Sequence, residues 1–302
     1  MEKVLVIGGT GFIGRNVIDN LKTHNIITGC YDLVKKDFGD YNYVGNVLYD
    51  DNLDSIIGEY DKIVYLITSV SPKKSMENPK EPYVNDIPLL LKVLDTAKTH
   101  NIKRVVFASS GGTVYGDNGN NKSKESDFNE PLNHYAICKL TSEKILEMYN
   151  KLYNMENISL RISNPFGFGQ NPKSNVGAIT VFANKIINDE EIVLFGDGNV
   201  VRDYIDVSEV AEAFYLALES DFNKIDTTPV FNIGSGQGLS LNEIISIISE
   251  VLNKNPKINH QPARKFDVKY NVLDTSKAEQ YLNYKHEKTE VENIKKYVKT
   301  LK

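Results

Sequence analysis

The stretch Gly8-Gly9-Thr10-Gly11-Phe12-Ile13-Gly14 decides how this chain folds. It follows the apolar run Val4-Leu5-Val6-Ile7 and leads into a segment with helical periodicity, so it predicts a strand, a glycine turn and a helix. In such a unit Gly8 permits the tight turn, Gly11 lets the backbone approach a pyrophosphate, and Gly14 lets the helix pack closely on the strand. The pattern therefore predicts a site for a dinucleotide.

The residues around the turn indicate which dinucleotide binds. The helix begins with Phe12 and Ile13, and the free N–H groups of its first turn would face the phosphates. Asp32 ends the second apolar run and lies where a doubly wound fold places the acid that accepts hydrogen bonds from the adenosine ribose. A carboxylate there would repel a 2′-phosphate, so NAD is favoured over NADP. Three basic residues leave some room for NADP: Arg15, Lys35 and Lys36.

Composition excludes several other classes of protein. The 302 residues are 41% hydrophobic and 25% charged, which is ordinary for a globular chain with one large core or two domains. A net charge of −5 offers no basic surface for nucleic acid. No run approaches the ~18 apolar residues of a membrane span, and the first strand starts without a signal peptide, so we expect a cytoplasmic protein. Cys30 and Cys138 lack the paired spacing of a disulfide or zinc site, and no metal is expected.

The first half of the chain alternates strand-like and helix-like segments, which predicts a parallel sheet covered on both faces. The loop over 68–82 would emerge at the carboxyl edge of that sheet, where ligands bind in open α/β folds. The expected strands are 3–8, 26–31, about 41–44, 61–67 and 103–109, and the expected helices are about 12–23, 51–58 and 86–100.

The second half changes character and predicts a smaller domain over the same edge of the sheet. We expect short strands near 192–198 and 230–234 and a helix over 240–252 that begins after the cap Ser240. The fold class is therefore α/β, a Rossmann-type doubly wound parallel sheet with a smaller C-terminal α/β domain for substrate. Its expected boundaries are 1–165 for the dinucleotide domain, with about 203–231 returning to it, and 166–302 for the substrate domain.

A second chemical motif follows the strand that ends at Ser109 and Ser110. Tyr135 and Lys139 are spaced to lie one turn apart on one face of a helix. A neighbouring ammonium and an oxidised nicotinamide would each favour the phenolate of the tyrosine and lower its pKa. Such a tyrosine can take the proton from a sugar hydroxyl while hydride leaves the same carbon.

Together these motifs resemble the extended short-chain dehydrogenase/reductase family, in its nucleotide-sugar epimerase and dehydratase branch. The resemblance covers nearly the whole chain and implies NAD as cofactor and Tyr135 and Lys139 as the catalytic pair. It also implies that Asn85 and Ser109 lie at the cofactor. It further implies that three residues bind a substrate with a pyrophosphate: Asn164, Arg202 and Arg264.

The sequence departs from the family at one catalytic position. The usual serine or threonine two residues before Thr113 is Gly111, so Ser110 or Thr113 must supply the hydroxyl near the sugar C4 oxygen. We give a weak preference to Thr113 and predict that its change to alanine lowers turnover far more than Ser110→Ala. The choice between the two hydroxyls stays open.

The same loop discriminates among the family's reactions. Dehydratases of the family carry Asp-Glu where this chain has Gly112-Thr113, and the 3,5-epimerase-reductases use a cysteine at the position of Gly111. The resemblance therefore implies epimerisation at C4 of a UDP-sugar, of the UDP-glucose/UDP-galactose type, through a 4-keto intermediate. The alternatives are an NADPH-dependent reductase of a 4-keto nucleotide sugar and a dinucleotide sensor without catalysis.

The remaining expectations concern partners. The family implies a homodimer built on the helices around 86–100 and 136–152. The sequence does not identify the sugar among glucose, N-acetylglucosamine and glucuronate. A glucuronate reader should offer a cation, for which three lysines are conceivable: Lys73, Lys74 and Lys173.

Overall fold

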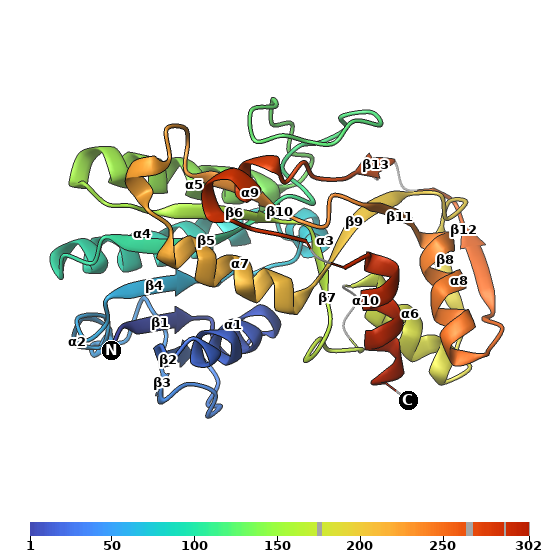
Figure 1. Ribbon diagram of the computed structural model, residues 1–302, viewed down its shortest axis with the longest axis horizontal. Helices are drawn as coiled ribbons and strands as arrows, with labels where there is room; N and C mark the ends of the chain where they lie inside the picture. Colours follow the sequence, from blue (N-terminus) through green and yellow to red (C-terminus); the bar gives the residue numbers. More distant parts are fainter. Residues whose placement is uncertain (174–176, 264–267, 287, 302) are drawn as a thin grey trace.

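The computed structural model describes residues 1–173, 177–263, 268–286 and 288–301. Figure 1 shows two regions side by side, one built on a large sheet and the other formed from later segments that include the C-terminal helix.

A seven-stranded parallel sheet forms the first region. Its strands are β1 (Lys3–Ile7), β2 (Ile27–Asp32), β3 (Tyr41–Val44), β4 (Lys62–Tyr65), β5 (Arg104–Ser110), β6 (Ile158–Ile162) and β10 (Val230–Ile233). They are ordered β10-β6-β5-β4-β1-β2-β3, so the direction of winding reverses between β1 and β4. This order confirms the predicted doubly wound fold, in which ligands bind at the carboxyl edge near the reversal.

Helices cover both faces of the sheet. One face carries α1 (Phe12–Thr23), α7 (Val207–Glu219) and α9 (Ser276–Leu282), and the other carries α2 (Leu53–Ile57), α4 (Glu81–Thr99) and α5 (His134–Tyr153). Successive side chains of β1 enter opposite cores, because a strand alternates its side chains between faces. Val4 and Val6 pack under α1 and α7, whereas Leu5 and Ile7 pack under α4 and α5.

The second region has its own apolar core. Its helices are α6 (Ala178–Ile187), α8 (Leu241–Leu252) and α10 (Glu290–Lys299). Ser240 and Glu243 form a capping box at the start of α8, as the predicted cap suggested. The strands β8 (Ile192–Phe195) and β12 (Ile258–Gln261) pair, and β9 (Val201–Asp206) joins β7 (Asn164–Phe166), β11 (Gly238–Ser240) and β13 (Tyr270–Asn271).

The structure differs from the expected elements mainly between β4 and β5. A short helix, α3 (Pro72–Glu77), lies where a loop was expected, because Ser71 caps it and Pro72 takes the first helical position. The next helix, α4, begins at Glu81 rather than near residue 86 and continues through Pro88. Proline is usual in the first turn of a helix and is tolerated less well inside one, yet α4 contains Pro88 within its length and so starts five residues before the expected position.

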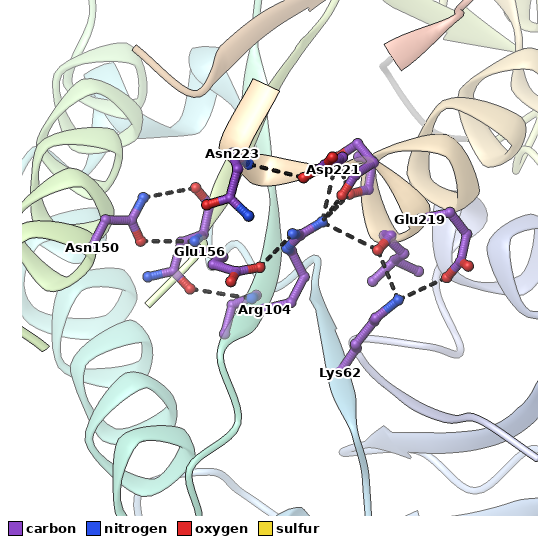
Figure 2. A network of polar contacts seen from close by, with 12 residues as sticks. Lys62, Arg104, Asn150, Glu156, Glu219, Asp221 and Asn223 are labelled. Carbon is purple, nitrogen blue, oxygen red and sulfur yellow. Dashed lines mark hydrogen bonds and ion pairs between the residues drawn. The ribbon is translucent and has the colours of Figure 1, made fainter. Parts of the chain in front are cut away.

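Basic residues at the amino end of the sheet hold the end of α7 (Figure 2). The Arg104 guanidinium is buried and donates to the carbonyls of Ala217 and Leu218 at 2.9 and 3.2 Å and to Glu156 Oε2 at 2.6 Å. Lys62 Nζ donates to the Leu218 carbonyl at 2.8 Å. Cations there satisfy carbonyls that the helix leaves unpaired and complement its dipole. Within the described residues, no helix has the length and apolar character needed to span a bilayer.

Candidate active site

The glycine turn has the shape that close approach of a dinucleotide requires. Gly8 has φ +86°, a conformation that favours glycine. A Cβ on Gly14 would lie 2.4 Å from the Gly8 carbonyl oxygen, so only glycine lets the helix pack against the turn. Gly11 is the N-cap of α1, and Phe12 and Ile13 are its first residues, so their amides have no partner within the helix. These residues fit the pyrophosphate of a dinucleotide.

The structure brings Asp32 beside this turn. β1 pairs with β2, so the carboxyl end of β2 lies next to Gly8. Asp32 Oδ2 accepts from the Thr10 amide at 3.0 Å and from the Thr10 hydroxyl at 2.8 Å. Its carboxylate therefore remains an acceptor at the edge where the ribose of a dinucleotide would lie. Nearby, the Arg15 guanidinium lies 4.4 Å from the centre of the Phe168 ring.

Tyr135 and Lys139 lie on one face of α5, close to the end of β5. Asn133 caps the helix and accepts from the Ala136 amide at 2.9 Å. The Lys139 ammonium is buried, donates to the Ala108 carbonyl at 2.8 Å and lies 5.5 Å from the centre of the Tyr135 ring. Ser75 of α3 accepts from the Tyr135 amide at 3.2 Å, so the helix that the sequence analysis missed helps to hold α5 in place.

Burial dominates the acid–base properties of this pair. It lowers the pKa of Lys139 to about 8, and nearby Asp86 opposes this shift. Burial also raises the pKa of Tyr135 to about 12, while a hydrogen bond with Ser110 favours the phenolate and Asp86 disfavours it. In the protein without cofactor, the pKa of the phenol therefore lies above its ordinary value, not below it as we expected. The loss of solvation outweighs the groups that favour the phenolate.

The two candidate hydroxyls lie in order from Tyr135. Thr113 Oγ1 donates to Ser110 Oγ at 3.0 Å, and Ser110 lies close enough to the Tyr135 phenol to lower its pKa. Ser110 rather than Thr113 is therefore the hydroxyl beside the tyrosine. The missing serine has a steric cause, since a Cβ on Gly111 would lie 2.5 Å from Leu273 Cδ1 and 2.9 Å from the Arg161 carbonyl oxygen.

Asp86 is a residue of this site that the sequence analysis missed. It is buried, and its carboxylate accepts from the Ser69 amide at 2.8 Å and from the Thr68 hydroxyl at 3.2 Å. The neighbouring Asn85, which we expected at the cofactor, is only partly buried. Asp86 lies on the buried stripe of α4 between Pro82 and Leu90, and an acid on an apolar helical stripe is the signal that could have found it.

The side chain of Ser109 is part of a buried polar network next to the site. Its hydroxyl is buried and donates to Glu143 Oε1 at 2.5 Å. Arg161 makes a buried two-pronged ion pair with Glu143, at 3.0 Å from Nε to Oε1 and 2.7 Å from Nη2 to Oε2. The Ser109 side chain thus belongs to a hydrogen-bond network that links β5, α5 and β6. If Ser109 contacts the cofactor, as we expected, the contact must come from the main chain of Ser109.

The expected substrate residues meet at a cavity in the second region. Asn164 and Arg202 both line this cavity, whose volume is about 340 Å³. Asn164 also lies beside the loop after β5, since a Cβ on Gly112 would be 3.6 Å from Asn164 Oδ1. Arg264 lies outside the described residues. The lysines considered for glucuronate, Lys73, Lys74 and Lys173, are exposed.

Comparison with known proteins identifies a matching family and similar relatives. The model of the NAD dependent epimerase/dehydratase family matches residues 4–234. A protein of Methanocaldococcus jannaschii with the provisional name UDP-glucose 4-epimerase is 32% identical over 313 residues, covering 99% of this chain and 98% of the relative.

Two solved structures share the whole fold. UDP-glucose 4-epimerase of Thermotoga maritima, solved with UDP-glucose, superimposes with a TM-score of 0.92 at 28% identity and covers 99% of this chain and 100% of its own. UDP-N-acetylglucosamine 4-epimerase of Methanobrevibacter ruminantium, in complex with UDP-N-acetylmuramic acid, gives 0.90 at 30% identity, with 99% and 98% covered. These matches confirm the predicted resemblance and the predicted cofactor, NAD: the chain belongs to the NAD dependent epimerase/dehydratase family.

Proposed function

We propose that this protein catalyses the NAD-dependent epimerisation of a UDP-sugar at C4. The observation that carries the proposal is the contact of Ser110 with the Tyr135 phenol, one helical turn from buried Lys139. This group lies at the carboxyl edge of the sheet that also holds the glycine turn and Asp32. The Thermotoga maritima epimerase, which was solved with UDP-glucose, supports the substrate class.

The side chains divide the proton chemistry. Tyr135 takes the proton of the C4 hydroxyl, and Ser110 shares that proton through its hydrogen bond to the phenol. When bound, NAD would supply a reversible hydride acceptor for C4 and a positive charge near the phenol. Tyr135 would return its proton to the C4 oxygen once the keto sugar presents its other face to the hydride. The pKa of about 12 for Tyr135 already includes the effect of the protein's own charges, so the positive charge of bound NAD is what would offset the burial and favour the phenolate.

Substrate binding is assigned to the second region. Arg202 and Asn164 line one cavity, and a guanidinium suits a pyrophosphate because it is always charged and donates in a fork. We keep Arg264 as a further pyrophosphate ligand on the strength of the resemblance. We also propose that the dinucleotide domain ends at residue 165 and that the substrate domain begins at residue 166.

Proton NMR of the purified protein with NAD tests the reaction. UDP-glucose, UDP-N-acetylglucosamine and UDP-glucuronate are incubated separately, and the anomeric signals are followed for a C4-inverted product. We expect UDP-glucose to convert without net NADH and Tyr135→Phe to abolish conversion. Ile137→Ala, which changes an exposed side chain of the same helix, should leave conversion unchanged.

Other outcomes would replace this proposal. Conversion of a 4-keto nucleotide sugar with consumption of NADPH would identify a reductase. Bound NAD without turnover of any of these sugars would identify a dinucleotide sensor. Conversion of only the N-acetylated or the glucuronate sugar would keep the reaction and correct the sugar.

We also propose that the protein is a homodimer in the cytoplasm. Helix α5 exposes apolar side chains on one face, among them Met148 and Leu152, which suits burial against a second copy. Cys30 and Cys138 are buried free thiols, as expected in a reducing compartment.

A further inference from the structure

Three ionisable side chains meet where α7, the segment before α10 and α10 itself come together. Glu209 lies in the first turn of α7, His286 lies between α9 and α10, and Glu290 is the first residue of α10. Each offers one ligand atom, and these atoms lie within 4.8 Å of one another. The cluster plays no part in the reaction proposed above.

Glu290 is in an unusual position for a carboxylate. It is 1% exposed, and neither of its oxygens has a hydrogen-bond partner among the described residues. The nearby Asn293 amide donates its hydrogen bond to Glu209 Oε1 at 3.2 Å. A buried acid needs a positive partner to remain ionised.

The imidazole of His286 is oriented to help supply that partner. A carboxylate can only accept, so the 2.6 Å contact with Glu209 Oε2 places the proton on His286 Nδ1. In the neutral ring, Nε2 presents its lone pair, and this atom is also buried without a hydrogen-bond partner in the described part of the chain. It lies 3.8 Å from Glu290 Oε1. Two acceptor atoms that face each other are arranged like two ligands of one metal ion. Metal–ligand bonds of ~2.0–2.1 Å would bring these two atoms to roughly 3.3 Å from each other.

We propose that His286 and Glu290, with Glu209 orienting the imidazole or completing the set, bind a divalent transition metal of the Zn²⁺ or Mn²⁺ type. One imidazole and two carboxylates are a donor set that such ions accept, with water in the remaining positions. A carboxylate that fixes the other ring nitrogen is the usual support of a metal-binding histidine. The chain spacing gave no hint of this site, because 77 positions separate Glu209 from His286.

A metal ion at this cluster could enter from solvent and would link two helices. Glu209 and Asn293 line a cavity of about 470 Å³ that opens beside the cluster. The ion would tie α10, which packs in the second region, to α7, which covers the large sheet. We therefore expect metal to raise thermal stability without entering the catalytic chemistry.

Metal binding to the tag-free full chain tests the proposal. After treatment with EDTA, we expect calorimetry and mass spectrometry to find one Zn²⁺ per chain and thermal unfolding to shift upward with Zn²⁺. Glu290→Gln should weaken binding by at least about tenfold and remove the shift, and Glu209→Gln should weaken it by about 10–100-fold. His24→Ala is the matched control and should behave like the wild type, since His24 also pairs with a glutamate of α7, at 3.3 Å from Glu212.

The opposite result is equally clear. Equal Zn²⁺ affinity of the wild type and Glu290→Gln, or no binding by the wild type, would overturn the proposal and leave an ordinary buried ion pair. Glu290→Leu serves if the glutamine variant does not fold, because leucine can fill the buried site without coordinating metal. Catalytic assays are not needed, so this test stands apart from that of the proposed function.

Discussion

At the scale of single residues, the site depends on charges that burial makes strong. Lys139 and Tyr135 both have pKa values shifted by loss of solvation, to about 8 and about 12. Asp86 raises both values, because a negative charge favours the ammonium and disfavours the phenolate. This acid is therefore a side chain that acts on both members of the pair, and we expect it to affect the pH range of the proposed reaction.

Asp86→Asn should move the acid limb of the pH–rate profile to lower pH. Removal of the negative charge lowers the pKa of Tyr135, so the phenolate forms at lower pH, and the ammonium of Lys139 also loses its proton at lower pH. The measurement is kcat/KM against pH for the variant and for Asp95→Asn, which removes an exposed acid of the same helix. An unmoved acid limb in Asp86→Asn would show that this carboxylate does not act on the base.

Removal of the Ser110 hydroxyl should lower the rate more than removal of the Thr113 hydroxyl, which is the opposite of our sequence-based preference. Ser110 contacts Tyr135, whereas Thr113 contacts Ser110, so Ser110→Ala should lower kcat by about 10²-fold or more and Thr113→Ala by less. Single-turnover rates with the substrate identified by NMR make the comparison. A larger loss in Thr113→Ala would return the role to Thr113.

At the scale of elements, the turn before α1 leaves no space for a side chain. A Cβ on Gly14 would lie 2.7 Å from Gly9 Cα as well as 2.4 Å from the Gly8 oxygen, and these backbone atoms cannot move aside cheaply. Gly14→Val should therefore cost about 1–3 kcal/mol of stability and abolish NAD binding, measured by denaturant unfolding and calorimetry. Gly119→Ala, where nothing lies within 4 Å, should retain NAD binding.

Sequence reasoning succeeded for elements with strong periodicity and failed where tertiary contacts decided. The apolar run of β4 and the cap of α8 are local signals, and both elements formed as predicted. Helix α3 is only six residues long, too short for a periodic pattern, and it is held by Ser75 against α5. Asp86 and Glu290 escaped notice because their importance depends on groups that folding brings from distant parts of the chain.

At the scale of the whole molecule, the exposed apolar face of α5 predicts how two copies meet. Met148 and Leu152 are 43% and 65% exposed and lie one turn apart. Met148→Glu should convert the proposed dimer to a monomer in light scattering, because a charge in an apolar interface loses solvation. Leu33→Glu, on an exposed residue next to Asp32 rather than on α5, should leave the dimer intact. A monomeric wild type would contradict the proposal.

The return of α7 and β10 to the large sheet has a consequence for how the chain is made. β6 cannot gain its outer neighbour until Val230–Ile233 has been synthesised, and Phe214 of α7 belongs to the core beneath β1 and β6. At ~5–20 residues per second, the roughly 70 residues between β6 and β10 take about 4–14 s to translate. During those seconds the nascent chain exposes one apolar face of its sheet, so the protein should depend on a chaperone at the ribosome more than its finished structure suggests.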